Sequence, residues 1–368
     1  MRKINYPSDS KAINELHIKY YSSIKVLDKK RINNKLRKAP KVNGATLTVK
    51  RLLTLDFKTI HELTISYQTF VQSFYNPTTK SNTFNEYFKY DLNQPELANF
   101  FMNKSGLDLN TCFYCGIDYI NAFKDIGDYK NAIEFLNRAT YTELQIIKGI
   151  GEKTALKIVS YRKKNTINKI EDITSSKGII KVLKSFKLAY SHNQFTLDHV
   201  LPQYKYPFLS LCLYNLVPSC YSCNAKFKKT KEFIENPNIL RISPTSGDYS
   251  LTSDFEFGIL YSGRLQDITS VNDFTLFRKV KRNKELIANY SSIFKIDGRY
   301  TFHKKELIQL IRDKAKYSSK KIKLLASEMG KTQLEVKKLI FGKEIFEEEL
   351  NKPLHKLKRD IAKNIKVI

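Results

Sequence analysis

The sequence predicts an α+β protein that is mostly helical, with a small metal-binding core, a helical insertion within that core and helical flanks. Three observations support this prediction. Two Cys-x-x-Cys pairs, at residues 112–115 and 220–223, bracket an Asp-His step at residues 198–199. A glycine-containing turn at 149–151 joins two stretches with helical periodicity, between the cysteine pairs. Both ends of the chain combine helical periodicity with an excess of basic residues.

Length and charge limit the class of protein. The chain has 368 residues, which is enough for two or three modules with their own cores. It contains 64 Lys and Arg against 36 Asp and Glu, a formal net charge of +28. A surplus of this size favours a polyanionic partner, because each neutralised phosphate releases counterions. A general bias toward lysine would raise glutamate as well, and glutamate is not raised here.

The sequence also predicts where the protein acts. No apolar run approaches the roughly 20 residues that a bilayer span needs, and the first ten residues lack the apolar core of a signal peptide. We therefore expect a cytoplasmic protein with no membrane partner. Because thiols stay reduced in that compartment, the paired cysteines are expected to bind zinc rather than form disulfides. Cys212 lies in an apolar run and is expected to be a buried side chain.

The Asp-His step has the chemistry of phosphodiester hydrolysis, which needs an activated water and positive charge on the phosphate. His199 suits the general base, since an ordinary histidine pKa of about 6.5 leaves it mostly neutral near pH 7. Asp198 would point to the other face of a strand, where its carboxylate can hold a hard divalent cation. Asn224 offers a second oxygen ligand, and Lys226 and Lys228 follow it on a predicted helix, within reach of phosphates.

These residues resemble the HNH endonuclease family, in its zinc-containing branch with a second Cys-x-x-Cys pair. The match covers residues 112–120 and 196–230. The resemblance implies a ββα-metal fold, two strands and a helix, around one catalytic Mg²⁺ or Mn²⁺ ion. By position it implies His199 as general base, Asp198 and Asn224 as ligands of that ion, and Asn215 as the residue that holds the hairpin. It also implies a structural Zn²⁺ bound by Cys112, Cys115, Cys220 and Cys223.

Several alternatives stay open at this point. A lone Asp-His step is more often a hydrogen-bonded surface pair, and the flanking cysteine pairs are what favour the nuclease. A zinc-containing subunit that binds DNA without cleaving it fits the same residues, and RNA is a possible substrate. A redox role for the first cysteine pair is disfavoured, because no thioredoxin-like βαβ pattern surrounds it. The resemblance further suggests an antiviral defence effector that acts with a partner ATPase.

The insertion contains a second motif. Thr140 and Glu143 have capping-box spacing, and Gly149-Ile-Gly151 predicts a tight turn into a second helix. Glycines let the backbone approach a phosphate, toward which the amides at the helix N-terminus then point. The stretch resembles the helix-hairpin-helix motif, which contacts the backbone of double-stranded DNA; a plain helical hairpin is the alternative. The predicted DNA contacts are Lys148, Gly149, Ile150, Gly151, Lys153 and Lys157.

The predicted organisation follows from these motifs. It comprises a basic helical region at 1–110, a split nuclease core at 111–130 and 191–235, the helix-hairpin-helix insertion at 131–190, a turn-rich segment at 236–300 and a basic helical region at 301–368. We expect a β-hairpin that starts near Asp254 and turns at Gly263. In the last region, 324–330 and 332–341 fit a helix-turn-helix or an ordinary helical hairpin, and the hairpin is preferred.

Overall fold

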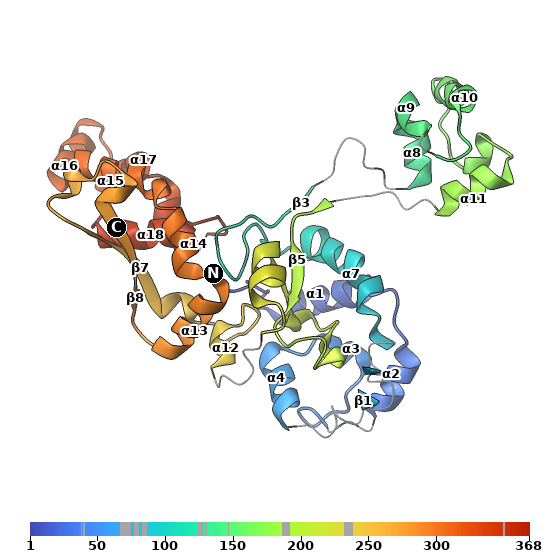
Figure 1. The fold of residues 1–368 in the computed structure, drawn as a ribbon, viewed down its shortest axis with the longest axis horizontal. Coiled ribbons are helices and arrows are strands. Elements are labelled where there is room, and N and C mark those ends of the chain that lie inside the picture. The colour runs from blue at the N-terminus through green and yellow to red at the C-terminus, as the bar shows by residue number, and fades with distance from the viewer. Residues whose placement is uncertain are drawn as a thin grey trace. The chain divides into compact units, whose positions relative to one another are not determined.

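The chain forms two compact units, Met1–Asn121 with Gln194–Ile368, and Ala122–Asn193 (Figure 1). The computed structural model describes residues 1–368 except 38, 40, 67–74, 77–80, 83–86, 124–128, 130, 146, 186–191, 232–237 and 349. Parts of the predicted core segments and of the predicted insertion, including 124–128 and 186–191, therefore lie outside the described residues. The second unit lies between the two cysteine pairs in the sequence.

The first unit begins with short helices whose starts are fixed by side-chain caps. Asp9, Asp28 and Thr48 accept hydrogen bonds from backbone N–H groups in the first turns of α1, α2 and α3. The elements of this segment are α1 Ser10–Ser23, α2 Lys29–Leu36, α3 Val49–Leu53, α4 Phe57–Ser66, β1 Tyr75–Asn76, β2 Ser81–Asn82, α7 Tyr90–Asn99 and η1 Phe100–Lys104. The apolar faces of these helices contribute buried side chains to the core of the unit.

A small hairpin with a following helix lies at the centre of the first unit. Strand β5 (Thr196–His199) pairs antiparallel with β6 (Leu216–Ser219), so that His199 faces Leu216 and Thr196 faces Ser219. Two short 3-10 turns, η3 Pro207–Leu209 and η4 Leu213–Asn215, lie between the strands, and η5 Ser222–Lys228 follows β6. Every residue of β6 is buried, so the hairpin lies within the core of the first unit.

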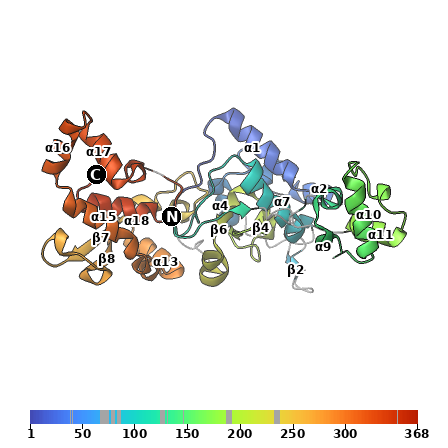
Figure 2. The same cartoon turned by 90° about the horizontal axis from the view of Figure 1, so that it is seen from above.

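The C-terminal part of the first unit packs helices on a longer hairpin. Strands β7 (Phe255–Tyr261) and β8 (Phe274–Val280) pair over their whole length. Helix α18 (His355–Asn364) lies along β7 (Figures 1 and 2), where Asp360 and Asn364 accept the backbone N–H groups of Phe257 and Ile259. These side chains satisfy donors on the outer edge of the hairpin, which would otherwise be open.

The other elements of this part are α12 Ile239–Ile242, η6 Leu251–Ser253, η7 Leu265–Asp267, η8 Val271–Asp273, α13 Lys284–Phe294, α14 Ile296–Phe302, α15 Lys305–Lys316, α16 Ser319–Glu328, α17 Gln333–Phe341 and η9 Lys343–Phe346. The expected hairpin is present, but its strands are joined through residues 262–273 rather than a tight turn at Gly263. Gly263 does adopt a positive φ of 77°, so the chain turns there before it continues through η7 and η8.

The second unit has its own core. Buried Leu136, Leu144, Ile150 and Ile158 form a cluster that is separate from the core of the first unit. Its elements are β3 Ala122–Phe123, α8 Ala132–Arg138, α9 Tyr141–Leu144, α10 Glu152–Arg162, η2 Ile170–Asp172, α11 Lys177–Ser185 and β4 His192–Asn193. Strands β3 and β4 pair where the chain enters and leaves the unit.

The predicted mixture of helices and strands, with helices dominant, is confirmed. In the part of the chain that the structure describes, each sheet consists of two strands. None of the described helices combines the length and the apolar character that crossing a membrane requires.

Candidate metal centre and nucleic-acid interface

The four paired cysteines meet in one buried cluster. Cys112 and Cys115 lie in the loop before Gly116, Cys220 directly follows β6, and Cys223 lies in the first turn of η5. Their sulfur atoms all lie within 4.8 Å of one another, and no disulfide joins them. Tetrahedral zinc with Zn–S bonds of about 2.3 Å places its sulfurs about 3.8 Å apart, which fits this cluster. The four cysteines can therefore hold a structural zinc ion.

Hydrogen-bond donors surround the cluster. Arg299 of α14 donates from Nη1 to the Cys223 sulfur at 3.2 Å and from Nη2 to the Cys115 sulfur at 3.4 Å. The same guanidinium donates to Asp118 at 2.7 Å. Four thiolates around Zn²⁺ carry a net charge of −2, so a positive group that bonds to one sulfur of each pair stabilises the metal-bound form. Cys212 lies outside the cluster, and burial raises the pKa of its thiol.

Asp198 lies on β5 with its carboxylate turned into the protein. Its Oδ2 accepts a 2.6 Å hydrogen bond from the Tyr114 hydroxyl, and Lys228 Nζ lies 3.1 Å from Oδ1 and 3.0 Å from Oδ2. Lys228 also donates to the His199 carbonyl at 2.8 Å. A carboxylate offers about four acceptor positions, and Tyr114 with Lys228 occupies up to three of them. The carboxylate is thus oriented by the protein and retains capacity for a further partner.

His199 is partly buried beside the Tyr90 ring, whose centroid is 4.6 Å away. Its Nε2 lies 2.9 Å from the carbonyl oxygen of Ser210. Because a carbonyl only accepts, Nε2 carries the proton and Nδ1 keeps a free lone pair. Burial lowers the pKa of His199 below its usual value, although the Ser210 contact opposes that shift. Burial thus favours the neutral imidazole, and the Ser210 contact leaves Nδ1 as the nitrogen that can accept a proton.

The two asparagines take different positions. Asn215 is fully buried and bonds across the turn, accepting from Leu201 N at 2.8 Å and donating to the carbonyls of Leu201 and Leu209. These three bonds hold the loop between β5 and β6. Asn224 on η5 donates from Nδ2 to Thr196 Oγ1 at 2.9 Å. That bond fixes the amide so that its oxygen faces away from Thr196.

Asp198, His199 and Asn224 line one cleft. A cavity of about 410 Å³ is lined by Tyr90, Thr196, Asp198, His199, Pro202, Tyr204, Asn224, Lys228 and Lys229, among others. The structure buries Lys228, at 1% exposure, beneath Asp198, although the sequence suggests a phosphate contact for it. Lys226 is exposed on the same helix. Lys228 therefore belongs to the floor of the cleft, and Lys226 remains the candidate for a phosphate contact.

The second unit presents a turn between two helices. The predicted capping box of Thr140 and Glu143 is present at the start of α9. Gly149 has φ +99°, a conformation that favours glycine, and a Cβ there would meet Ile179 at 3.0 Å. Gly151 is the N-cap of α10, and space is open where its Cβ would stand. Backbone amides at the start of α10 are thus accessible to an anion.

The predicted DNA-contact residues of the second unit differ in how exposed their side chains are. Ile150 is buried and anchors the turn in the core of the unit. Lys148, Lys153 and Lys157 are exposed on the turn and on α10. Cations that flank free amides at a helix N-terminus form a surface suited to a phosphate backbone.

Residues 135–182 match the helix-hairpin-helix motif. The match extends from α8 into α11, so it covers the Gly149–Gly151 turn and α10. It confirms the predicted DNA-binding motif in the insertion. Comparison with curated proteins and with solved structures finds no significant match. The HNH resemblance has no family match and stays a prediction.

Two parts of the site were missed from the sequence. Tyr114, between the first two cysteines, bonds to Asp198, and Arg299 bonds to the cysteine cluster. Both contacts join residues far apart in the chain, and no local spacing marks them. The position of Tyr114 between two predicted zinc ligands was the one available signal, because those ligands fix its backbone close to the predicted core.

Proposed function

We propose that this protein is a metal-dependent endonuclease that cleaves double-stranded DNA. The observation that carries the proposal is the position of His199, whose Nε2 contacts the Ser210 carbonyl, in a cleft shared with Asp198 and Asn224. A helix-hairpin-helix motif in the same chain supplies contact with the DNA backbone. The net charge of +28 is consistent with a nucleic-acid partner.

In the proposed mechanism, His199 Nδ1 accepts a proton from the attacking water. Asp198 and Asn224 offer the oxygen atoms that would hold a Mg²⁺ or Mn²⁺ ion, which supplies positive charge to the phosphate and to the departing oxygen. Asn215 keeps the loop of His199 in place through three bonds to Leu201 and Leu209. The cysteine cluster holds the two segments of the core together.

The second candidate is a zinc-containing protein that binds DNA without cleaving it. The close pairing of Asp198 with Lys228 favours this candidate, because an ammonium 3.0 Å from the carboxylate repels a divalent cation. A role in antiviral defence with a partner ATPase rests on the HNH resemblance alone.

Cleavage of supercoiled plasmid tests the proposal. The full chain is incubated with plasmid and Mg²⁺ or Mn²⁺, with EDTA as the metal-free control. We expect nicked or linear product that disappears with EDTA and in His199→Ala, while the variant still retards plasmid on a gel. His303→Ala, which changes a histidine outside the cleft, is the matched control and should cleave normally. Retardation without cleavage under every metal condition would support the binding protein instead.

A further inference from the structure

Helices α16 and α17 lie side by side in the C-terminal part of the first unit, joined by residues 329–332 (Figures 1 and 2). Gly330 turns the chain at φ +58°. The N–H of Lys331 then donates to the Ala326 carbonyl at 2.9 Å, which closes the end of α16. A connection of three or four residues that contains glycine is typical of a helix-turn-helix.

The outward side of α17 carries both apolar and polar groups. Val336 is buried against the core, whereas Leu334 and Leu339 are 51% and 60% exposed. Lys338, partly exposed, lies one helical turn from Leu334 on the same side, and Gln333 is exposed at the first position of the helix. In the major groove, glutamine and lysine read base edges, and apolar side chains contact the thymine methyl. This side of α17 therefore favours the helix-turn-helix over the ordinary hairpin that the sequence alone prefers.

The charge around α16 and α17 favours a polyanion. Residues 319–341 contain six lysines and two glutamates. One of these, Glu335, is directed to the start of its own helix, where Oε2 accepts two hydrogen bonds of 2.8 Å from the N-cap residue. Lys320, Lys323 and Lys331 are exposed and form no ion pair with any residue that the structure describes. These lysines are available to phosphates.

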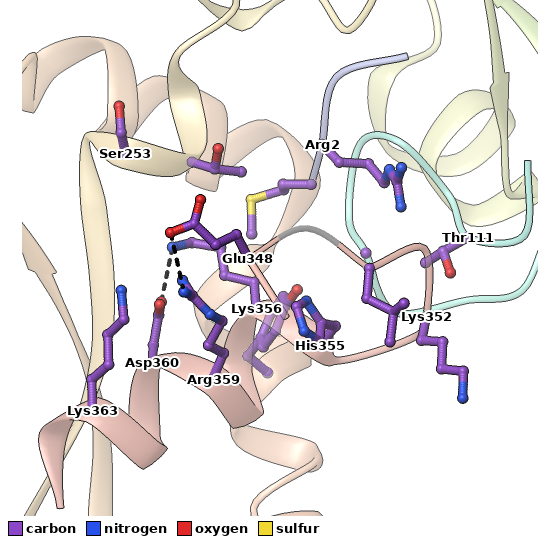
Figure 3. A pocket seen from close by; sticks show the side chains of 15 residues that line it. Arg2, Thr111, Ser253, Glu348, Lys352, His355, Lys356, Arg359, Asp360 and Lys363 are labelled. Atoms are coloured by element: carbon purple, nitrogen blue, oxygen red, sulfur yellow. Dashed lines mark hydrogen bonds and ion pairs between the residues drawn. The ribbon is translucent and has the colours of Figure 1, made fainter. Parts of the chain in front are cut away.

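The cavity between α18 and the loop around Thr111 differs in this respect (Figure 3). There Lys356 pairs with Asp360 at 2.8 Å, and Arg359 lies 3.8 Å from Glu348. Charges of opposite sign in that lining compensate one another, so the uncompensated charge of this part of the chain lies on α16 and on the turn before α17.

We propose that α16 and α17 form a helix-turn-helix that reads the sequence of double-stranded DNA. Helix α17 enters the major groove with Gln333, Leu334 and Lys338 at the base edges, and α16 crosses the phosphate backbone. Lys331 in the turn meets a phosphate. The helix-hairpin-helix motif contacts the backbone, which carries no sequence information, so this second contact supplies the specificity. The inference rests on the duplex binding in the proposed function and not on cleavage.

Selection from a random duplex library tests the proposal. The full chain is incubated with the library without added Mg²⁺ or Mn²⁺, so that binding is measured apart from cleavage, and the bound duplexes are sequenced. We expect one short sequence to be enriched, and the enriched duplex to bind at least about ten-fold more tightly than a scrambled duplex at the same salt concentration. A library that enriches no sequence would overturn the proposal and leave the exposed leucines of α17 for a protein partner.

Gln333→Ala is the decisive variant, because it removes a base contact at an exposed position without changing the net charge. It should weaken binding of the enriched duplex about ten-fold and leave binding of the scrambled duplex unchanged. Gln309→Ala, which changes an exposed glutamine on α15, is the matched control and should alter neither. Lys331→Gln should weaken both duplexes alike and reduce the salt slope by about one. Full preference for the enriched duplex in both Gln333→Ala and Lys338→Gln, with both folded by circular dichroism, would refute the assignment to α17.

Discussion

Replacing Lys228 with methionine tests the arrangement beneath the cleft, because this lysine is the buried counter-charge of Asp198. Their side chains are 1% and 4% exposed, with Nζ 3.0 Å from Oδ2. Removing one partner of a buried ion pair leaves an uncompensated charge, which costs about 3–5 kcal/mol. At about 2 °C per kcal/mol for a domain of this size, Lys228→Met should lower the Tm of the first unit by roughly 6–10 °C.

The double variant Asp198→Asn with Lys228→Met separates charge from packing. With both charges removed, no ionised group is left unpaired, so the double variant should be more stable than Lys228→Met alone by about 2 kcal/mol. Thermal unfolding of the zinc-loaded chain, followed by circular dichroism, measures both effects. Lys226→Met changes an exposed lysine on the same helix and should melt with the wild type. A Lys228→Met protein that also melts with the wild type would refute the buried ion pair.

Four further outcomes are expected. Cys223→Ser should lose the zinc ion that we expect at one per wild-type chain, as measured by metal analysis of dialysed protein; a fully loaded variant would contradict the cluster. Lys153→Glu should weaken duplex DNA binding several-fold and reduce the salt slope by about one, whereas Lys164→Glu, just past the C-terminal end of α10, should do so less; equal losses would point to general charge. Burial lowers the pKa of His199 below its usual value of about 6.5, so this histidine loses its basic form only at lower pH. The cleavage rate should therefore begin to fall only below about pH 6.5; a rate that already falls above that pH would exclude His199 as the base. Gly149→Ala should destabilise the second unit by about 1–3 kcal/mol in thermal unfolding, because φ +99° strains any other residue; unchanged stability would contradict that turn.

Features encoded by short spacing were predictable. Each Cys-x-x-Cys pair is a local signal for zinc, whereas the sharing of one ion by both pairs was implied by the HNH resemblance, and the structure brings their sulfurs within 4.8 Å. The capping box of Thr140 and Glu143 is also local, and it is present. Gly149 and Gly151 indicated the turn that the helix-hairpin-helix match confirms. In these cases the residues that define the feature also make its contacts.

Features that depend on distant partners were not predictable. Lys228 follows Asn224 on a helix and is typical of a surface lysine, but η5 turns it inward, where Asp198 and the His199 carbonyl accept its hydrogen bonds. Nothing within a few residues distinguishes it from the exposed Lys226. Thr111 and the α18 cations likewise line one cavity only after the loop of Thr111 and α18 pack together.

The zinc cluster and the cleft are joined through Tyr114. Cys112 and Cys115 fix the backbone on both sides of this residue, and its hydroxyl bonds to Asp198 at 2.6 Å. Its carbonyl accepts a 2.6 Å bond from Tyr290, and its ring stacks on Phe294 of α13 at 4.8 Å. Tyr114 is therefore held from both sides, and it cannot shift without moving the carboxylate.

This connection makes the orientation of Asp198 depend on the metal cluster. Zinc loss would free the loop of Tyr114, and Asp198 would then keep Lys228 as its charged partner but lose the hydroxyl that selects its rotamer. Tyr114→Phe isolates that effect, because it removes the hydroxyl and leaves the cysteines and the stacking on Phe294 in place. We expect this variant to retain zinc and DNA binding but to need more Mg²⁺ for half-maximal cleavage. An unchanged Mg²⁺ requirement in an active wild-type background would show that Tyr114 supports the fold without positioning Asp198.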